Sequence, residues 1–275
     1  MMRRSYIDTS GGQVHAREWG DGSELVLLLH QTAASSAMFE LFAAELEQAA
    51  IGHAYRFLAI DTPGFGESFV PADAYSLAEW ADTVLEVATA QRAHSFHVLG
   101  HHTGAAIAAT VAATAPDRVT SLAMIGALGL LPDERERWSD SVHGMLLDEH
   151  GSHLLTAWQQ VATIDGDPLA FPPSLELRQR EVVDKLKAGV RWHEAYLTVF
   201  TTDVLGTLAQ TSCPAVLFSG TADVLHPYVE ATLQARPGID YVELAAGAYV
   251  LDQQPALVAK PYIEFLASVS AGVLA

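Results

Sequence analysis

The stretch VLGHHTGA, residues 98–105, joins an apolar run to an alanine-rich segment. Residues 96–99 (FHVL) are predicted to form a strand, and the alanine-rich residues 104–115 are predicted to form a helix. Gly100 and Gly104 flank the turn between them, where the absence of a β-carbon allows the backbone to turn tightly. The stretch therefore predicts a strand that turns sharply into a helix.

Strand and helix signals alternate on both sides of this turn. The continuous apolar run at residues 25–29 indicates a buried strand, and further strands are predicted at residues 56–60 and 119–125. Helices are predicted at residues 36–49 and from the capping box Ser76-Leu77-Ala78-Glu79 to about Gln91. Residues 4–8 and 13–19 are predicted to form a hairpin. The alternation indicates an α/β protein with a doubly wound, mostly parallel sheet and helices on both faces.

The alternation stops after residue 131. Residues 132–207 contain no buried-strand run and are predicted to form a helical cap inserted into the core. Strand signals return at 215–219 and 241–244, and a last helix is expected at 255–267. We therefore expect a core domain of residues 1–131 and 208–275, interrupted by the cap.

Composition excludes several classes of protein. The 275 residues carry 15 Lys and Arg against 33 Asp and Glu, a net charge of −18, and half of them are hydrophobic. This balance argues against disorder, nucleic-acid binding and attachment to anionic membranes. The single cysteine, Cys213, gives no disulfide framework, and no targeting segment or membrane span is recognisable. We expect a cytoplasmic monomer or homodimer that acts on a small molecule.

Several motifs together resemble the α/β-hydrolase fold superfamily, especially its capped members that hydrolyse esters, lactones and C–C bonds of diketones. The loop DTPGFGES at residues 61–68 matches a family motif position for position, and His30-Gln31 resembles the family's His-Gly pair. Residues 216–223 (VLFSGTAD) resemble the segment that carries the triad acid, and residues 246–255 (AGAYVLDQQP) the segment that carries the triad histidine. The resemblance covers nearly the whole chain and implies the same fold.

The chain departs from the family pattern at the catalytic positions. The nucleophile elbow of the family is Gly-x-Ser-x-Gly, and here His102 stands in the place of the serine. The usual triad histidine is replaced by Ala248, and no histidine follows His226. Asp223, at the acid position, is kept, whereas Gln31 replaces a glycine. A Ser-His-Asp mechanism is therefore unavailable, because both the hydroxyl and its base are missing.

We interpret these changes as a compensated exchange. The longer imidazole of His102 could lean into the space that Ala248 vacates and donate one ring N–H to Asp223, leaving the other nitrogen as a base toward the pocket. Such a dyad could activate water, abstract a substrate proton or attack the substrate directly. The alternative is an inactive descendant in which His102 only fills space.

The remaining site positions follow from their roles in the family. The backbone N–H groups of Thr32 and Thr103 correspond to the oxyanion donors. Candidate substrate-binding residues are His30, Gln31, Trp192, Tyr196 and Tyr249. Each has a plainer alternative: His30 could hold the oxyanion loop, Gln31 could face solvent, and the three aromatic residues could be ordinary packing.

No metal or cofactor is expected. His30, His102, Asp223 and His226 could in principle hold zinc, but no familiar ligand spacing supports such a site. The sequence therefore favours a hydrolase of a small, mostly apolar ester, lactone or diketone. Two alternatives stay open: a lyase or cofactor-free proton-transfer enzyme, since both occur on this fold, and a non-catalytic small-molecule binder.

Overall fold

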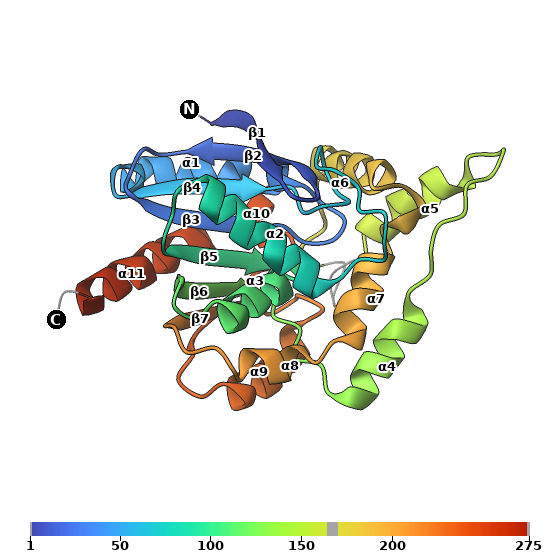
Figure 1. The fold of residues 1–275 in the computed structure, drawn as a ribbon. Coiled ribbons are helices and arrows are strands. Elements are labelled where there is room, and N and C mark those ends of the chain that lie inside the picture. The colour runs from blue at the N-terminus through green and yellow to red at the C-terminus, as the bar shows by residue number, and fades with distance from the viewer. Residues whose placement is uncertain (1, 164–169, 274–275) are drawn as a thin grey trace.

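A computed structural model describes residues 2–163 and 170–273 and contains one eight-stranded sheet (Figure 1). The strand order is β1-β2-β4-β3-β5-β6-β7-β8. The strands are β1 Arg3–Thr9, β2 Gly12–Trp19, β3 Glu24–Leu29, β4 Tyr55–Ile60, β5 Phe96–His101, β6 Val119–Ile125, β7 Ala215–Gly220 and β8 Asp240–Leu244. The hairpin β1–β2 is antiparallel and β2 pairs antiparallel with β4, whereas β3 to β8 run parallel. The predicted fold class is confirmed.

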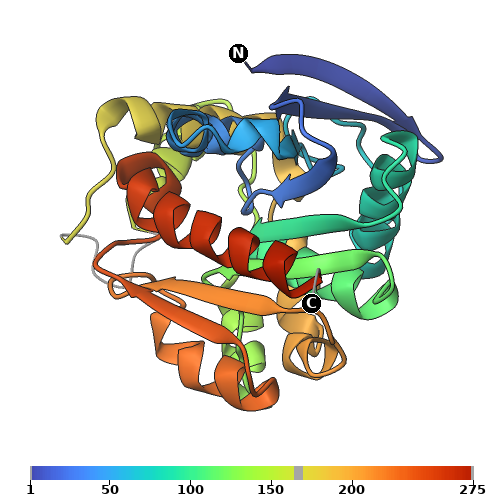
Figure 2. The same cartoon turned by 90° about the vertical axis from the view of Figure 1, so that its left-hand side faces the viewer.

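Both faces of the sheet are covered by helices. On one face lie α1 Glu40–Gln48 and α11 Pro255–Val273, and Figure 2 shows α11 crossing in front of the strands. On the other lie α2 Leu77–Ala90 and α3 Thr103–Thr114. Along β3, Leu25, Leu27 and Leu29 face the layer of α2 and α3, and Val26 and Leu28 face that of α1 and α11. This two-sided burial explains why the strand is a continuous apolar run.

A group of helices separates β6 from β7, and within its described residues there is no strand. Four of them lie together at one end of the sheet in Figure 1: α4 Pro132–Ser141, α5 Ser152–Val161, α6 Leu175–Lys187 and α7 Glu194–Thr201. The short α8 Val204–Leu208 leads back to β7. The remaining helical segments are η1 Ser36–Phe39, η2 Ile51–His53, η3 Gly189–Arg191, η4 His226–Tyr228, α9 Val229–Ala235 and α10 Val250–Gln253.

The structure corrects three local predictions. The helix expected at residues 36–49 is divided into η1 and α1, because the first turn is of the 3-10 type. Ser76 is the N-cap residue of α2, but its side chain makes no capping hydrogen bond, so the predicted capping box is not formed. Helix α11 continues to Val273 instead of ending near residue 267. Within the described part of the chain, no helix has the length and apolar character needed to cross a bilayer.

Candidate active site

The sharp turn between β5 and α3 holds His102 in an unusual backbone conformation. Its φ is +50°, in the left-handed region that non-glycine residues rarely adopt. The turn is closed by two glycines: a Cβ on Gly100 would overlap the carbonyl of Gly104, and a Cβ on Gly104 would overlap the carbonyl of Leu29. The close approach of these backbones therefore explains both glycines and fixes His102 at the amino end of α3.

His102 and Asp223 form a buried hydrogen-bonded pair. The Nε2 atom of His102 lies 2.8 Å from Oδ2 of Asp223, which follows the end of β7. The other carboxylate oxygen, Oδ1, accepts the Leu225 N–H at 2.8 Å. Burial raises the pKa of Asp223, but the charge and hydrogen bond of His102 and the Leu225 N–H outweigh it, so the net pKa lies below its ordinary value. An ionised Asp223 then fixes Nε2 as the protonated ring nitrogen, leaving Nδ1 without a partner among residues 2–163 and 170–273.

Gly126, the residue after β6, makes the room for the imidazole. A Cβ built at this position would lie 2.5 Å from Cδ2 and 2.6 Å from Nε2 of His102, and 2.8 Å from Oδ2 of Asp223. Its φ of +59° also favours glycine. From the sequence, this space was expected to come from Ala248, which is fully buried. Gly126, which no sequence motif marks, thus lies directly against the pair.

His101 is the closest further histidine. Its ring meets that of His102 edge to face, with centroids 4.5 Å apart, and both of its nitrogens are buried without a hydrogen-bond partner in the described structure. Burial lowers its pKa well below the ordinary value, so the ring is neutral. Ligand atoms of His101, His102 and Asp223 lie within 4.8 Å of one another, and among the described residues these three form the group that could hold a metal ion.

The four-residue zinc set considered from the sequence is not brought together. His30 donates from Nδ1 to the carbonyl of Gln31 at 2.7 Å and accepts the N–H of Thr62 on Nε2 at 2.9 Å. His226 lies at the surface, where Nδ1 is 3.1 Å from the hydroxyl of Ser219. Both rings are therefore engaged away from His102.

The two expected oxyanion donors lie side by side. The hydroxyls of Thr32 and Thr103 are 2.8 Å apart, and in the described residues neither backbone N–H is used by an acceptor. The hydroxyl of Tyr196, on α7, donates to the carbonyl of Thr32 at 2.9 Å. A contact from the helices between β6 and β7 therefore holds the loop that carries Thr32 against the start of α3.

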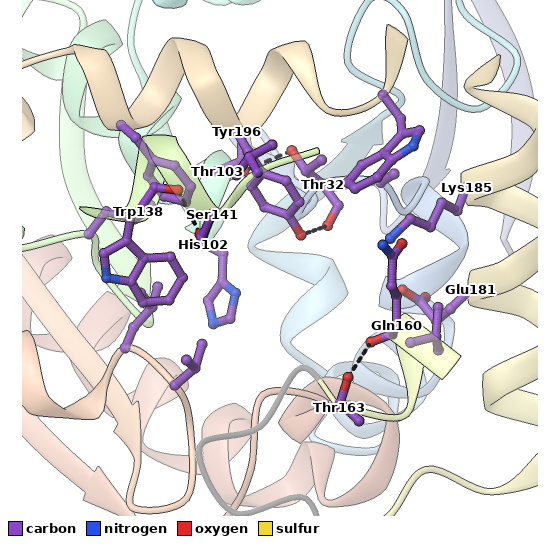
Figure 3. A pocket seen from close by; sticks show the side chains of 18 of the residues that line it. Thr32, His102, Thr103, Trp138, Ser141, Gln160, Thr163, Glu181, Lys185 and Tyr196 are labelled. Atoms are coloured by element: carbon purple, nitrogen blue, oxygen red, sulfur yellow. Dashed lines mark hydrogen bonds between the residues drawn. The ribbon is translucent and has the colours of Figure 1, made fainter. Parts of the chain in front are cut away.

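A cavity of about 320 Å³ opens above this arrangement (Figure 3). His102, Thr32 and Thr103 line it, as do three of the predicted substrate-binding residues, Trp192, Tyr196 and Tyr249. Much of the remaining wall is apolar: Ala33, Leu128, Trp138, Val142, Val161, Phe200, Val224 and Leu225. The hydroxyl of Tyr249 donates to the carbonyl of Val161 at 3.0 Å, so it also links the core to α5.

His30 and Gln31, which the sequence analysis also named as substrate-binding residues, do not line the cavity. The hydrogen bonds of His30 described above join the loop after β3 to the loop after β4, and burial lowers its pKa, which keeps the ring neutral. Gln31 is buried rather than exposed to solvent, and its amide nitrogen points to Glu181 at 3.5 Å. Both side chains therefore lie outside the cavity and contact the loops and the helix that form its wall.

Sequence reasoning missed two charged residues of the cavity, Glu181 and Lys185 on α6. Burial raises the pKa of Glu181 to about 7 despite the opposing effect of Arg180, and burial lowers the pKa of Lys185 to about 8. The only sequence signal is their spacing of four residues, which places them on one face of a helix. Charged residues at this spacing are common on solvated faces, so the pattern does not distinguish a cavity wall from a surface.

Comparison with known proteins identifies the family to which the chain is similar. A family model described as the alpha/beta hydrolase fold matches residues 24–248. The acetyltransferase component of an acetoin-cleaving system from Cupriavidus necator is 31% identical over 126 residues, which are 45% of this chain and 32% of that protein. A protein of Klebsiella pneumoniae named "Putative carbamate hydrolase RutD" is 26% identical over 208 residues, 74% of this chain and 77% of that protein.

The first three curated relatives are matched over less than half of their own length, at most 46%. Among solved structures, a hydrolase from Pseudomonas aeruginosa superposes with a TM-score of 0.75, covering 96% of this chain and 98% of that one at 23% identity. At that identity the likeness shows the fold alone.

Proposed function

Because this chain belongs to the α/β-hydrolase fold family, we propose that it hydrolyses a small, mostly apolar carbonyl compound with His102 as the general base. The substrate class is an ester, a lactone or a diketone. The observation that carries the proposal is the 2.8 Å hydrogen bond between Nε2 of His102 and Asp223 at the wall of the cavity. In a protein that only binds a ligand, this imidazole would have no reason to meet a buried carboxylate.

The mechanism begins with water. With Nε2–H donated to Asp223, Nδ1 of His102 accepts a proton from a water molecule as its oxygen bonds to the substrate carbonyl carbon. The ionised Asp223 stabilises the imidazolium that forms. The carbonyl π electrons move to oxygen, and the resulting anion accepts hydrogen bonds from the N–H groups of Thr32 and Thr103. His102 then returns its proton to the leaving oxygen or carbon as the bond to the carbonyl carbon breaks.

The cavity fits a substrate of this class. Its volume of about 320 Å³ suits a small molecule, and its largely apolar wall would exclude bulk water. The N–H groups of Thr32 and Thr103 are without acceptors in the described structure, so they are ready to bind a developing negative charge. Tyr196 supports this function, because its hydroxyl holds the carbonyl of Thr32.

The test is turnover of a substrate panel by the native protein and the His102→Gln variant. The panel contains 4-nitrophenyl acetate and butyrate, five- and six-membered lactones, and a 1,3-diketone, in water enriched in ¹⁸O. We expect at least one substrate to be converted, with one heavy oxygen in the acid product, and a loss of roughly 100-fold or more in His102→Gln. His94→Gln is the matched control, because His94 is exposed and outside the cavity.

Three results would contradict the proposal. Equal turnover by the native and His102→Gln proteins would remove His102 from the mechanism. Saturable binding of panel compounds without any conversion would instead favour a non-catalytic binder. Conversion without uptake of ¹⁸O would point to lyase or proton-transfer chemistry at the same residues.

A further inference from the structure

The side-chain ammonium of Lys185 lies at the cavity wall and forms no ion pair with the described residues. The residue is 9% exposed and lines the cavity from α6. Its Nζ atom lies 3.7 Å from the centre of the Trp192 ring. Within residues 2–163 and 170–273, Nζ has neither a carboxylate within 4.0 Å nor a hydrogen-bond acceptor. Three N–H donors are therefore unused at the cavity wall.

Two other cationic residues of α6, Arg180 and Lys187, are both paired with carboxylates. Arg180 makes two hydrogen bonds to the carboxylate of Asp252 and a third to Glu181. Lys187, two residues after Lys185, forms an ion pair with Glu67 at the surface. A buried charge without hydrogen bonds is costly. Among the described residues this ammonium has only the face of the Trp192 ring and the more distant charge of Glu181, so it is free to bind an anionic group in the cavity.

We propose that Lys185 binds a carboxylate of the substrate, so that the proposed hydrolase acts on a carbonyl compound that carries an acid group. This inference rests on the proposed function. Figure 3 shows Lys185 and Glu181 on the opposite side of the cavity from His102, so one molecule with its carboxylate at Lys185 presents its carbonyl toward His102, Thr32 and Thr103. The apolar wall between them contacts the connecting carbon chain.

Glu181 sets the charge of this subsite. Its carboxylate is hydrogen-bonded to Arg180 and lies near the amide of Gln31. Asp252 and Asp184 both act on Arg180, whereas Glu181 is the carboxylate that acts on the charge of Lys185. An ionised Glu181 therefore balances Lys185, and a protonated Glu181 leaves the ammonium without that balance. Because burial raises the pKa of Glu181 to about 7, the subsite is more positive below neutral pH. The other titratable groups of the cavity wall are His102, His143, Tyr196 and Tyr249.

The direct test is binding of hexanoate and of its neutral counterpart hexanamide, measured by titration calorimetry at pH 6.5. We expect the native protein to bind hexanoate at least tenfold more tightly than hexanamide, since a charge-assisted hydrogen bond contributes about that factor or more. Lys185→Gln should lose at least tenfold for hexanoate and leave hexanamide unchanged. Lys185→Arg should retain the preference, and Lys187→Gln, with the same charge change on the same helix, should behave as the native protein.

Turnover distinguishes this inference from the proposed function. The matched substrates are 4-nitrophenyl hydrogen glutarate, which carries a carboxylate, and 4-nitrophenyl butyrate, which does not. We expect a lower KM for the glutarate ester in the native protein, and a rise of at least tenfold in that KM in Lys185→Gln with kcat less affected.

Hexanoate binding that depends on Lys185, together with no turnover of any substrate, would support the anion subsite and refute the hydrolase. Turnover that depends on His102 but shows no preference for the acid substrate would refute the subsite alone. Equal hexanoate affinity of the native and Lys185→Gln proteins, each confirmed as folded by circular dichroism, would also overturn the inference.

Discussion

The Gly126→Ala variant tests how the His102–Asp223 pair is positioned. The added Cβ would lie 2.5 Å from Cδ2 of His102, whereas ordinary van der Waals contact begins near 3.4 Å. The imidazole must therefore move by about 1 Å, and since the Cβ is also 2.8 Å from Oδ2 of Asp223, the ring cannot move without disturbing the hydrogen bond.

Two costs follow for stability. Alanine at a φ of +59° costs about 1–2 kcal/mol through its backbone conformation. Weakening a buried hydrogen bond to a charged group costs about 1.5–3 kcal/mol more. We expect the free energy of unfolding to fall by about 3–5 kcal/mol, and turnover of the best panel substrate to fall roughly 100-fold, because a catalytic base displaced by about 1 Å loses about that factor.

Gly238→Ala is the matched control. Gly238 has a φ of +88°, is exposed, and has no atom within 4 Å of a built Cβ, so its substitution measures the backbone cost alone. Urea unfolding and turnover are measured for both variants. If Gly126→Ala loses no more stability than Gly238→Ala and retains native turnover, then Gly126 does not position the ring and this reasoning is refuted.

Three further outcomes are expected. Tyr196→Phe removes the hydroxyl that holds the Thr32 carbonyl, so kcat/KM should fall about three- to tenfold, and unchanged kinetics would show that this contact does not order the oxyanion donors. Asp61 is buried, which raises its pKa, but the hydrogen bonds of His15, Ser36 and the Glu67 N–H hold the net pKa below the ordinary value of about 4. It therefore contributes stability that is present above that pH and is lost as the pH falls, so urea unfolding at pH 7 and pH 3 should show a smaller pH-dependent loss in Asp61→Asn than in the native protein. Treatment with EDTA and gel filtration should leave turnover unchanged, whereas a loss that zinc restores would assign a metal to His101, His102 and Asp223.

Much of the fold could be predicted from the sequence, because its signals are local. Residues 25–29 are a short, continuous apolar run, and residues 96–99 are apolar except for His97. Burial on both faces of a parallel sheet selects such short apolar stretches. Helix ends were less predictable. Ser76 has the residue type of a capping box, but its hydroxyl makes no capping hydrogen bond, and composition alone does not reveal the rotamer.

The candidate site could be predicted only where a position had a known role. His102 and Asp223 were expected to meet, and their side chains lie within hydrogen-bonding distance. Gly126 could not be predicted, because a single glycine after a strand is common. Its role depends on the His102 ring, which lies where a Cβ of residue 126 would be. Lys185 was missed for a related reason, because its place in the cavity wall is visible only once α6 is positioned over the core.

The division of the chain into core and cap, the cytoplasmic location and the monomeric or dimeric state stay predictions. The roles of Thr32 and Thr103 as anion donors are likewise part of the proposal, although their N–H groups lie at the cavity without acceptors in the described residues.

A double-mutant cycle on His102 and Asp223 tests most directly whether the two side chains act as one catalytic unit. Turnover is measured for His102→Gln, Asp223→Asn and the double variant, with circular dichroism confirming that each is folded. If the pair works as a unit, each single change lowers kcat/KM by roughly 100-fold or more, and the double variant is no slower than the slower single variant. Losses that multiply, or native turnover in either single variant, would contradict it.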